Sequence, residues 1–201
     1  MNDPVPTGNT YDKYGSRNPL ERALVAGFLR RIDSLLPAGR VGRILEVGMG
    51  EGQVAARVRA RYPSALITGI DLPDADLAAH WRHRRLPGAF ANGTALPFPD
   101  RAFDLVLGIE VLEHVAQPVA VLHEIARVAR GPVVLSVPSE PVWRVANMAR
   151  GKYLRALGNT PGHVQHFTPG AFTRFVGEAL DVVSVARPFP WTVVAAQSRA
   201  A

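Results

Sequence analysis

Residues 44–52 read Ile-Leu-Glu-Val-Gly-Met-Gly-Glu-Gly, a short apolar run that enters a glycine-rich turn. Because residues 53–61 follow with a helical pattern, the stretch predicts a buried strand that turns sharply into a helix. Glycine permits a positive φ and leaves no β-carbon between the backbone and a ligand. The N–H groups at the start of the helix would suit a carboxylate or a phosphate. This turn is therefore the first candidate for a ligand site.

Strands and helices alternate on both sides of the turn. Apolar runs predict further strands at residues 65–71, 89–91, 103–108, 132–137, 182–185 and 191–195, and helical spacing predicts helices at 19–36, 74–85, 118–130 and 169–180. We therefore expect an α/β fold, a Rossmann-like, doubly wound, mostly parallel seven-stranded sheet with helices on both faces. The sequence predicts a single domain over residues 1–201, with residues 1–18 as a mobile arm or lid and an irregular insertion at 138–166.

The composition narrows the class of protein. Of 201 residues, 47% are hydrophobic and 20% are charged, which argues against global disorder. The absence of cysteine excludes disulfides, thiolate zinc sites, iron–sulfur clusters and cysteine nucleophiles. No apolar run approaches the roughly 20 residues that span a bilayer, so we expect a cytoplasmic protein without a membrane partner. The net charge of +6 is spread along the chain, which makes nucleic acid an unlikely partner.

The spacing of the glycines separates this turn from other phosphate-binding turns. Gly48, Gly50 and Gly52 do not follow the G-x-G-x-x-G pattern of dinucleotide sites, and no G-x-x-x-x-G-K-[ST] loop occurs. Asp71 ends the next predicted strand, where its two oxygens could accept hydrogen bonds from both hydroxyls of a ribose. The glycine turn and Asp71 together indicate an adenosine-bearing ligand. The alternative is a tight turn beside a solvated carboxylate.

Five segments, in this order, resemble the class I S-adenosylmethionine-dependent methyltransferases, in particular their small-molecule branch. The segments are residues 44–52, 69–71, 95–100, 103–106 and 110–115. The resemblance covers about residues 40–137, and five ordered segments rarely coincide by chance.

The resemblance implies S-adenosyl-L-methionine as the methyl donor and assigns residues to it. Gly48 and Gly50 would approach the methionine moiety, with Glu46 ordering the turn. Asp71 would hold the ribose. The remaining donor-site residues would be Leu72 beside the adenine, Asn92 where many relatives carry aspartate, Gly93 and Thr94 through backbone contacts, and Glu110 in the wall of the pocket. For Leu72 and Thr94 the alternative roles are packing and turn capping.

Methyl transfer requires the nucleophile in line with the methyl carbon, and a hydroxyl nucleophile also requires removal of its proton. If residues 110–114 form a helix, Glu110, Glu113 and His114 share one face. His163 and His166 lie in a loop expected on the same side of the sheet. We take His163, His166 and His114 as candidate catalytic residues, with capping and surface hydrogen bonding as the alternative for the loop histidines.

The same residues suggest a metal site. Glu110, Glu113, His114 and His166 would together offer two carboxylates and two imidazoles, a donor set that suits Mg²⁺, Mn²⁺ or Fe²⁺. The arrangement is similar to that of the methyltransferases that 2′-O-methylate small-RNA 3′ ends and of the ubiquinone-biosynthesis-type O-methyltransferases. Many metal-free relatives contain the same Glu-Val-Leu-Glu-His segment, in which Glu113 and His114 satisfy local backbone groups.

The insertion would form the wall on the acceptor side. Its mixture of aromatic and basic residues, which includes Trp143, Arg144, Arg150, Lys152 and Tyr153, suits an anionic or polyhydroxylated small-molecule acceptor. In the arm, Tyr11, Tyr14 and Arg17 could close over the pocket and exclude water.

The sequence thus predicts a methyltransferase that methylates a small molecule, on a hydroxyl group, with or without a metal. The alternatives are an RNA 2′-O-methyltransferase and a non-catalytic protein that binds S-adenosylmethionine. Either a monomer or a homodimer fits the sequence.

Overall fold

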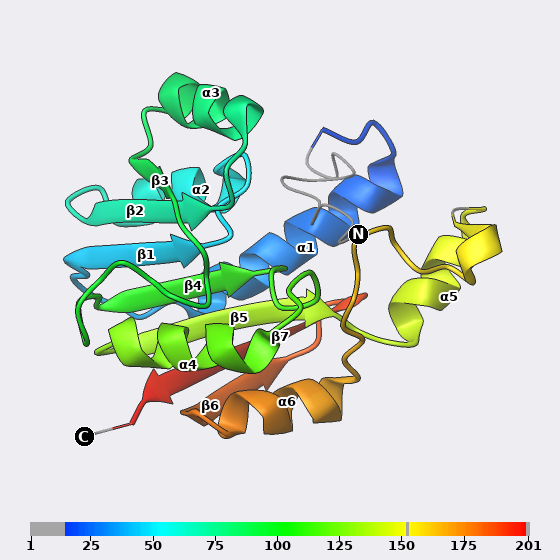
Figure 1. Ribbon diagram of the computed structural model, residues 1–201. Helices are drawn as coiled ribbons and strands as arrows, with labels where there is room; N and C mark the ends of the chain where they lie inside the picture. Colours follow the sequence, from blue (N-terminus) through cyan, green and yellow to red (C-terminus); the bar gives the residue numbers. More distant parts are fainter. Residues whose placement is uncertain (1–14, 152, 200–201) are drawn as a thin grey trace.

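The strands form one sheet in the computed structural model, which describes residues 15–151 and 153–199 (Figure 1). Its strands are β1 (Arg43–Val47), β2 (Leu66–Asp71), β3 (Gly88–Phe90), β4 (Leu105–Ile109), β5 (Pro132–Pro138), β6 (Leu180–Ala186) and β7 (Trp191–Ser198). They lie in the order β3-β2-β1-β4-β5-β7-β6. All pair in parallel except β7, which is antiparallel to both of its neighbours. The strand order reverses between β1 and β4, the place where ligands bind in sheets of this kind.

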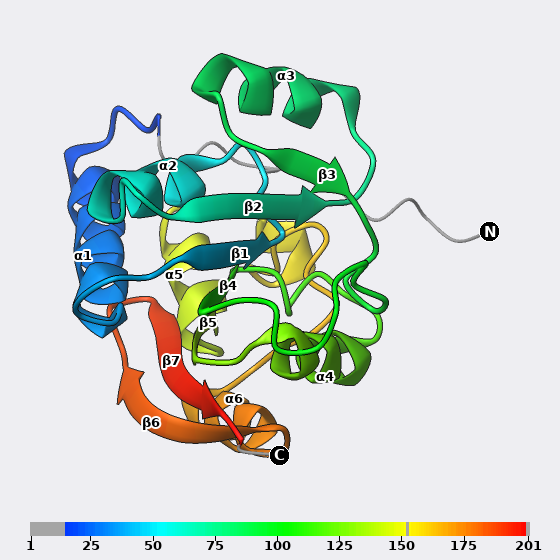
Figure 2. The same cartoon turned by 90° about the vertical axis from the view of Figure 1, so that its left-hand side faces the viewer.

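Helices cover both faces of the sheet. They are α1 (Pro19–Leu35), α2 (Gln53–Arg61), α3 (Ala75–Arg84), α4 (Pro118–Val128), α5 (Val142–Ala149) and α6 (Pro169–Gly177), with a short 3₁₀ helix, η1 (Leu154–Ala156). Figure 2 shows α1 and α2 on one side of the sheet and α4 on the other. The expected α/β architecture is therefore confirmed, with one antiparallel strand near its edge.

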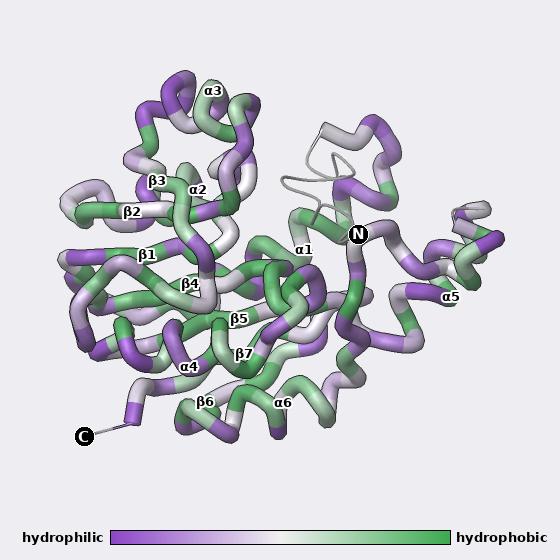
Figure 3. The backbone as a smooth tube through the Cα atoms, in the orientation of Figure 1, coloured by the Kyte–Doolittle hydropathy of each residue, from purple (hydrophilic) through white to green (hydrophobic). Residues whose placement is uncertain are grey.

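Alternation along the strands divides the apolar residues between two cores. In β4, Leu105 and Leu107 pack with α1 and α2, whereas Val106 between them packs with α4 and α6. This is the two-residue period of a strand that is buried on both faces. The central strands β4 and β5 are accordingly drawn largely in the hydrophobic colour (Figure 3). Two packed cores hold the carboxyl ends of the strands in place.

Helix α1 brings its first turn to the same edge of the sheet. Asn18 caps the helix by accepting a hydrogen bond from the Leu20 N–H, and Pro19 occupies the first helical position. Phe28 and Ile32 bury the other end of the helix in the core. The beginning of α1 therefore lies beside the carboxyl ends of the strands (Figure 1).

Two details of the expected secondary structure are wrong. The helix predicted to run to residue 180 ends at Gly177, because Leu180 begins β6 and is buried in the sheet. The insertion at 138–166 is not irregular throughout, since it contains α5 and η1. Within the described ranges, no helix combines the length and the apolar character that a membrane crossing requires.

Candidate active site

A cavity of about 680 Å³ lies at the carboxyl edge of the sheet. Its walls come from the turn after β1, the end of β2, the segment after β4, the start of α1, and α5. Of the candidate site residues, the cavity lining includes Glu46, Gly48, Gly50, Asp71, Leu72, Asn92, Gly93, Thr94, Glu110, His114 and His163. A volume of this size is typical of pockets that hold small molecules.

The glycine turn adopts the conformation that its sequence requires. Gly48 and Gly50 have φ values of 70° and 52°, in the left-handed region that glycine enters without a steric penalty. A β-carbon on Gly48 would lie 2.2 Å from a methyl group of Val111, whereas one on Gly50 would meet no atom within 4 Å. The backbone of Gly50 is therefore accessible from the cavity.

Asp71 connects this turn to the end of β2. Its Oδ2 accepts a hydrogen bond of 2.7 Å from the Gly50 N–H, and its Oδ1 accepts one of 2.8 Å from the Leu72 N–H. Burial raises the pKa of this carboxyl group, and the two backbone hydrogen bonds oppose that shift. Since each carboxylate oxygen can accept a further hydrogen bond, the group is held in place with acceptor capacity remaining.

Glu46 lies deeper in the same wall and is only 2% exposed. Burial, and next the negative charge of Asp71, hold the pKa of Glu46 well above its usual range. Its Oε2 atom is buried and has no hydrogen-bond partner among the described residues. A buried acceptor without a partner is costly, so this oxygen is suited to a donor group of a bound ligand.

On the next side of the cavity, Asn92 stabilises its own turn. Its side-chain oxygen accepts a hydrogen bond of 3.0 Å from the Thr94 N–H. The side-chain carbonyl that was expected to face an adenine amino group is thus already engaged locally. Leu72, Gly93 and Thr94 line the cavity beside it.

The segment after β4 is not the helix that would place Glu110, Glu113 and His114 on one face. Glu110 has a φ of 57°, and the next residues form a turn closed by a hydrogen bond from the His114 N–H to the Val111 carbonyl. The Glu110 N–H donates to Ser136 on β5. The helix prediction is wrong because these backbone groups bond across the sheet edge instead of along a helix. Glu110 Oε1 accepts a hydrogen bond of 2.7 Å from the Trp191 Nε1–H.

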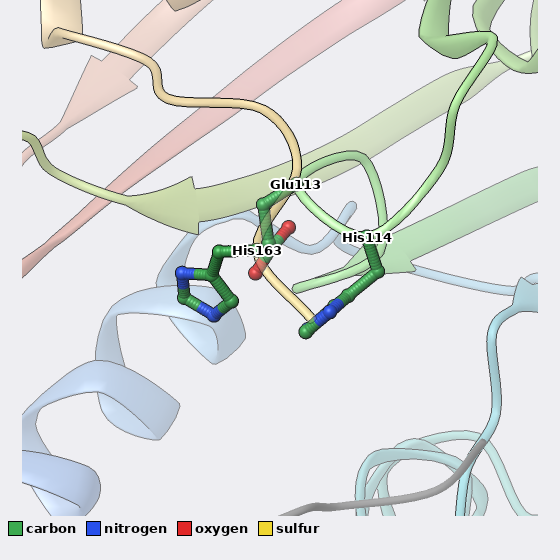
Figure 4. A group of neighbouring side chains, drawn as sticks. All are labelled: Glu113, His114 and His163. Atoms are coloured by element: carbon green, nitrogen blue, oxygen red, sulfur yellow. The ribbon is translucent and has the colours of Figure 1, made fainter. Parts of the chain in front are cut away.

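The turn still brings Glu113 and His114 together, with His163 as the third member of the group. Their potential ligand atoms lie within 4.8 Å of one another (Figure 4). The two loops are joined by hydrogen bonds from the N–H groups of Val164 and Gln165 to the Glu113 carbonyl. His114 Nδ1 lies 3.0 Å from the Gly162 carbonyl oxygen. Because a carbonyl only accepts, Nδ1 carries the hydrogen and a neutral ring has its lone pair on Nε2.

This group differs from the expected metal set by including His163 and excluding Glu110 and His166. His166 has a side chain that is 39% exposed and lies 3.7 Å from the Glu140 carboxylate. It is not among the described residues that line the cavity. Only two residues separate His163 from His166 in the sequence, but the loop directs the first toward Glu113 and the second toward Glu140.

Several residues of the cavity were not found from the sequence. Trp191 begins β7 and stacks on Phe28 with ring centroids 4.6 Å apart. Thr160 accepts hydrogen bonds from Trp143 Nε1 and Asn147 Nδ2. Glu21 on α1 accepts one of 2.9 Å from Arg150, the residue that follows α5. The partners lie 13 to 163 residues apart, and only Glu21, an acidic residue on the otherwise apolar side of α1, gives a local signal in the sequence.

The described arginines Arg144 and Arg150 of the insertion donate hydrogen bonds mainly to other groups of the insertion. Arg144 donates to the Leu157 carbonyl, and Arg150 donates to Asn147 as well as to Glu21. In the expected arm, Arg17 is exposed. Tyr11, Tyr14 and Lys152 lie outside the described residues.

Comparisons with known proteins agree with this geometry. A family model described as a methyltransferase domain matches residues 45–135. A fatty-acid O-methyltransferase from Mycolicibacterium smegmatis is 33% identical over 123 residues, 59% of this chain and 43% of that protein. A 27-O-demethylrifamycin SV methyltransferase from Amycolatopsis mediterranei is 31% identical over 107 residues, 50% of this chain and 39% of that protein. The chain therefore spans less than half the length of these two curated relatives.

The fold is also shared with a solved structure. A Thermotoga maritima protein described as an S-adenosylmethionine-dependent methyltransferase, a possible histamine N-methyltransferase, superposes with a TM-score of 0.67 at 17% identity. The match covers 90% of this chain and 95% of that one. The family model thus matches residues 45–135 to a methyltransferase domain, the two curated relatives are methyltransferases, and the fold is the one found in this S-adenosylmethionine-dependent methyltransferase.

Proposed function

We propose that this protein transfers the methyl group of S-adenosylmethionine to a hydroxyl group of a small-molecule acceptor. The observation that carries the proposal is the acidic wall of the cavity, where Asp71 holds the accessible backbone of Gly50 and where Glu46 and Glu110 also line the cavity. S-adenosylmethionine carries a sulfonium and an ammonium group, and a cavity wall of this charge favours cations. The relatives that methylate oxygen support the choice of a hydroxyl acceptor.

Each group of this wall has a role that its geometry supports. The Asp71 carboxylate, fixed by two backbone N–H groups, accepts hydrogen bonds from the ribose hydroxyls. The buried Oε2 of Glu46 gives an ammonium group the acceptor that it needs. Gly48 and Gly50 let the backbone approach the methionine part, while Leu72, Gly93 and Thr94 border the adenine. When bound, S-adenosylmethionine supplies an electrophilic methyl group on sulfur.

We assign the proton transfer to His163, with His114 as its neighbour. His163 is buried, lines the cavity and lies in ring contact with His114, with centroids 4.9 Å apart. A neutral imidazole is an effective general base at neutral pH. His166 does not share this position, so we place it outside the proton transfer.

A divalent cation is the second route to the same chemistry. Glu113, His114 and His163 offer one carboxylate and two imidazoles, a donor set suited to Mn²⁺ or Fe²⁺ and less suited to Mg²⁺. A metal ion there would lower the pKa of an acceptor hydroxyl. If the ion is essential, EDTA abolishes turnover and Mn²⁺ or Mg²⁺ restores it. Turnover that persists in EDTA assigns the proton transfer to the imidazole alone.

The proposal is tested first by donor binding. Calorimetry should detect S-adenosylhomocysteine, the demethylated donor, and should detect no binding of NAD. A fractionated small-molecule extract is then incubated with the protein and a donor radiolabelled on its methyl group, and label should enter an organic-soluble product. Binding of NAD instead of the nucleoside would contradict the proposal.

Two other functions give different results in these assays. An RNA 2′-O-methyltransferase, which the Glu113–His114–His163 group would also suit, would label RNA and would bind it with a steep dependence on salt. A non-catalytic protein would bind the donor but would label no acceptor.

A further inference from the structure

The part of the cavity beyond the donor-binding wall has a distinct chemistry. We call it the acceptor chamber, and define it by Leu24, Trp143, Tyr153, Phe189 and Trp191 together with the Glu21–Arg150 ion pair. It lies between the start of α1, α5 and the residues that lead into β7. Trp143 and Trp191 are in ring contact, with centroids 5.7 Å apart. An apolar, aromatic lining of this kind binds flat apolar molecules by ring stacking and by burial of their surface.

The charge of the chamber is balanced internally. Arg150 is the one arginine or lysine among the described residues that line the cavity. Its Nη1 donates to Glu21 Oε1 at 2.9 Å, its Nη2 to Asn147 Oδ1 at 2.5 Å, and its Nε to the Ala146 carbonyl at 3.2 Å. Glu21 also accepts a hydrogen bond of 2.6 Å from Ser16 Oγ. Each of the three guanidinium nitrogens thus donates to a protein acceptor.

A negatively charged acceptor would meet an unfavourable environment here. It would have to displace Glu21 from Arg150, which breaks an ion pair whose carboxylate is only 10% exposed. Breaking a part-buried ion pair whose carboxylate is buried is unfavourable. The other cavity carboxylates, Glu51, Asp71 and Glu110, would add repulsion.

We propose that the acceptor chamber selects uncharged aromatic acceptors, and that Glu21 is the specificity residue that excludes anionic ones by neutralising Arg150. This inference rests on the proposed function and specifies its acceptor. It replaces the anionic acceptor that the basic insertion suggests, because Arg144 and Arg150 of that insertion already donate to protein groups.

The test uses three probes that share one ring system and differ in charge: 2-naphthol, 6-hydroxy-2-naphthoate and 6-(aminomethyl)-2-naphthol. Calorimetry on the protein saturated with S-adenosylhomocysteine should give the tightest binding for neutral 2-naphthol. In Glu21→Gln, which keeps the size of the side chain, the affinity for the naphthoate should rise by about 10-fold, equivalent to about 1.4 kcal/mol. The affinity for 2-naphthol should change by less than about 3-fold, because its apolar contacts remain.

Asp33→Asn is the matched control. It removes one carboxylate from the same helix, where Asp33 pairs with Arg57 of α2 outside the cavity, so the ratio of the probe affinities should not change. Arg150→Gln is the second variant. It leaves the charge of Glu21 in the chamber and should therefore favour the aminomethyl probe over the naphthoate.

Three results would overturn the inference. They are naphthoate binding to the unchanged protein at least as tightly as 2-naphthol, a naphthoate-to-naphthol ratio that neither variant shifts, and no binding of any naphthol. The donor is measured separately. If S-adenosylhomocysteine does not bind but the probe order is as expected without it, the proposed function fails while the charge selectivity of the chamber stands.

Discussion

The two ends of the cavity are built in different ways. At the donor end, neighbouring strands and the turns after them form the wall, and its central hydrogen bond joins Gly50 to Asp71, 21 residues away. At the acceptor end, side chains from distant segments form the wall, and its central ion pair joins Glu21 to Arg150, 129 residues away. The donor end therefore depends on backbone geometry that the fold itself supplies. The acceptor end depends on particular side-chain pairs that can change without changing the fold.

The strongest test of this difference is to remove His163, the base that we propose, and leave the donor wall intact. His163→Ala should lower the turnover number by about 10²- to 10⁴-fold, the usual contribution of a general base. The affinity for S-adenosylhomocysteine, measured by calorimetry, should stay within about 3-fold because His163 is placed on the acceptor side. His166→Ala is the control and should retain nearly full turnover. Equal losses in both variants would remove His163 from the role of base.

The complementary test is to break the donor wall. Asp71→Ala should weaken the binding of S-adenosylhomocysteine by about 100-fold, since hydrogen bonds to a charged group contribute about 1.5–3 kcal/mol each. Asp71→Asn keeps the size of the side chain and should lose less. Naphthol binding, measured on the same variants without donor, should be preserved if the two ends are independent. An unchanged donor affinity in Asp71→Ala would refute its role at the ribose.

The smallest expected effect concerns the stability of the donor wall. Burial raises the pKa of Glu46 in the folded protein. The protonated side chain therefore contributes fully to stability when the pH is below the unfolded-state pKa of this group. That contribution is lost as the pH rises through the folded-state pKa. At pH 7, Glu46→Gln should therefore raise the free energy of unfolding of the ligand-free protein, by on the order of 1 kcal/mol.

The check on Glu46 is a series of thermal unfolding curves from pH 4 to pH 8. The unchanged protein should lose stability relative to Glu46→Gln as the pH rises, and the variant should bind the donor more weakly. Parallel curves for the two proteins would show that Glu46 is not protonated or strained in the folded state.

The comparison also explains what could be predicted from the sequence. The strands, the glycine turn and the carboxylate at the end of β2 follow from local patterns, because hydrophobic periodicity and glycine spacing act over short distances. The expected position of Asp71 beside Gly50 follows from parallel pairing of β1 and β2. The resemblance to the methyltransferases rests on the same local segments, and the comparisons confirm it.

The acceptor end could not be predicted in the same way. The spacing of Glu110, Glu113 and His114 suits a helix, but Glu110 bonds to Ser136 on the neighbouring strand and the segment turns instead. Nothing local distinguishes His163 from His166, since the His163 ring lies against His114 and Trp143, and the His166 ring lies beside Glu140. Long-range pairs such as Trp191 with Glu110 leave no periodic signal.

The reversed direction of β7 has a practical consequence for handling the protein. Because β7 is antiparallel to β5, its first residue, Trp191, lies at the cavity, and its last residue, Ser198, lies at the opposite edge beside Pro132 and Leu180. A dye or surface linker placed after β7 would thus start from the far edge of the sheet and leave the cavity mouth uncovered. One placed before α1 would start at that mouth, where Asn18 and Leu20 line the cavity. Immobilisation for binding assays should therefore use the carboxyl-terminal side.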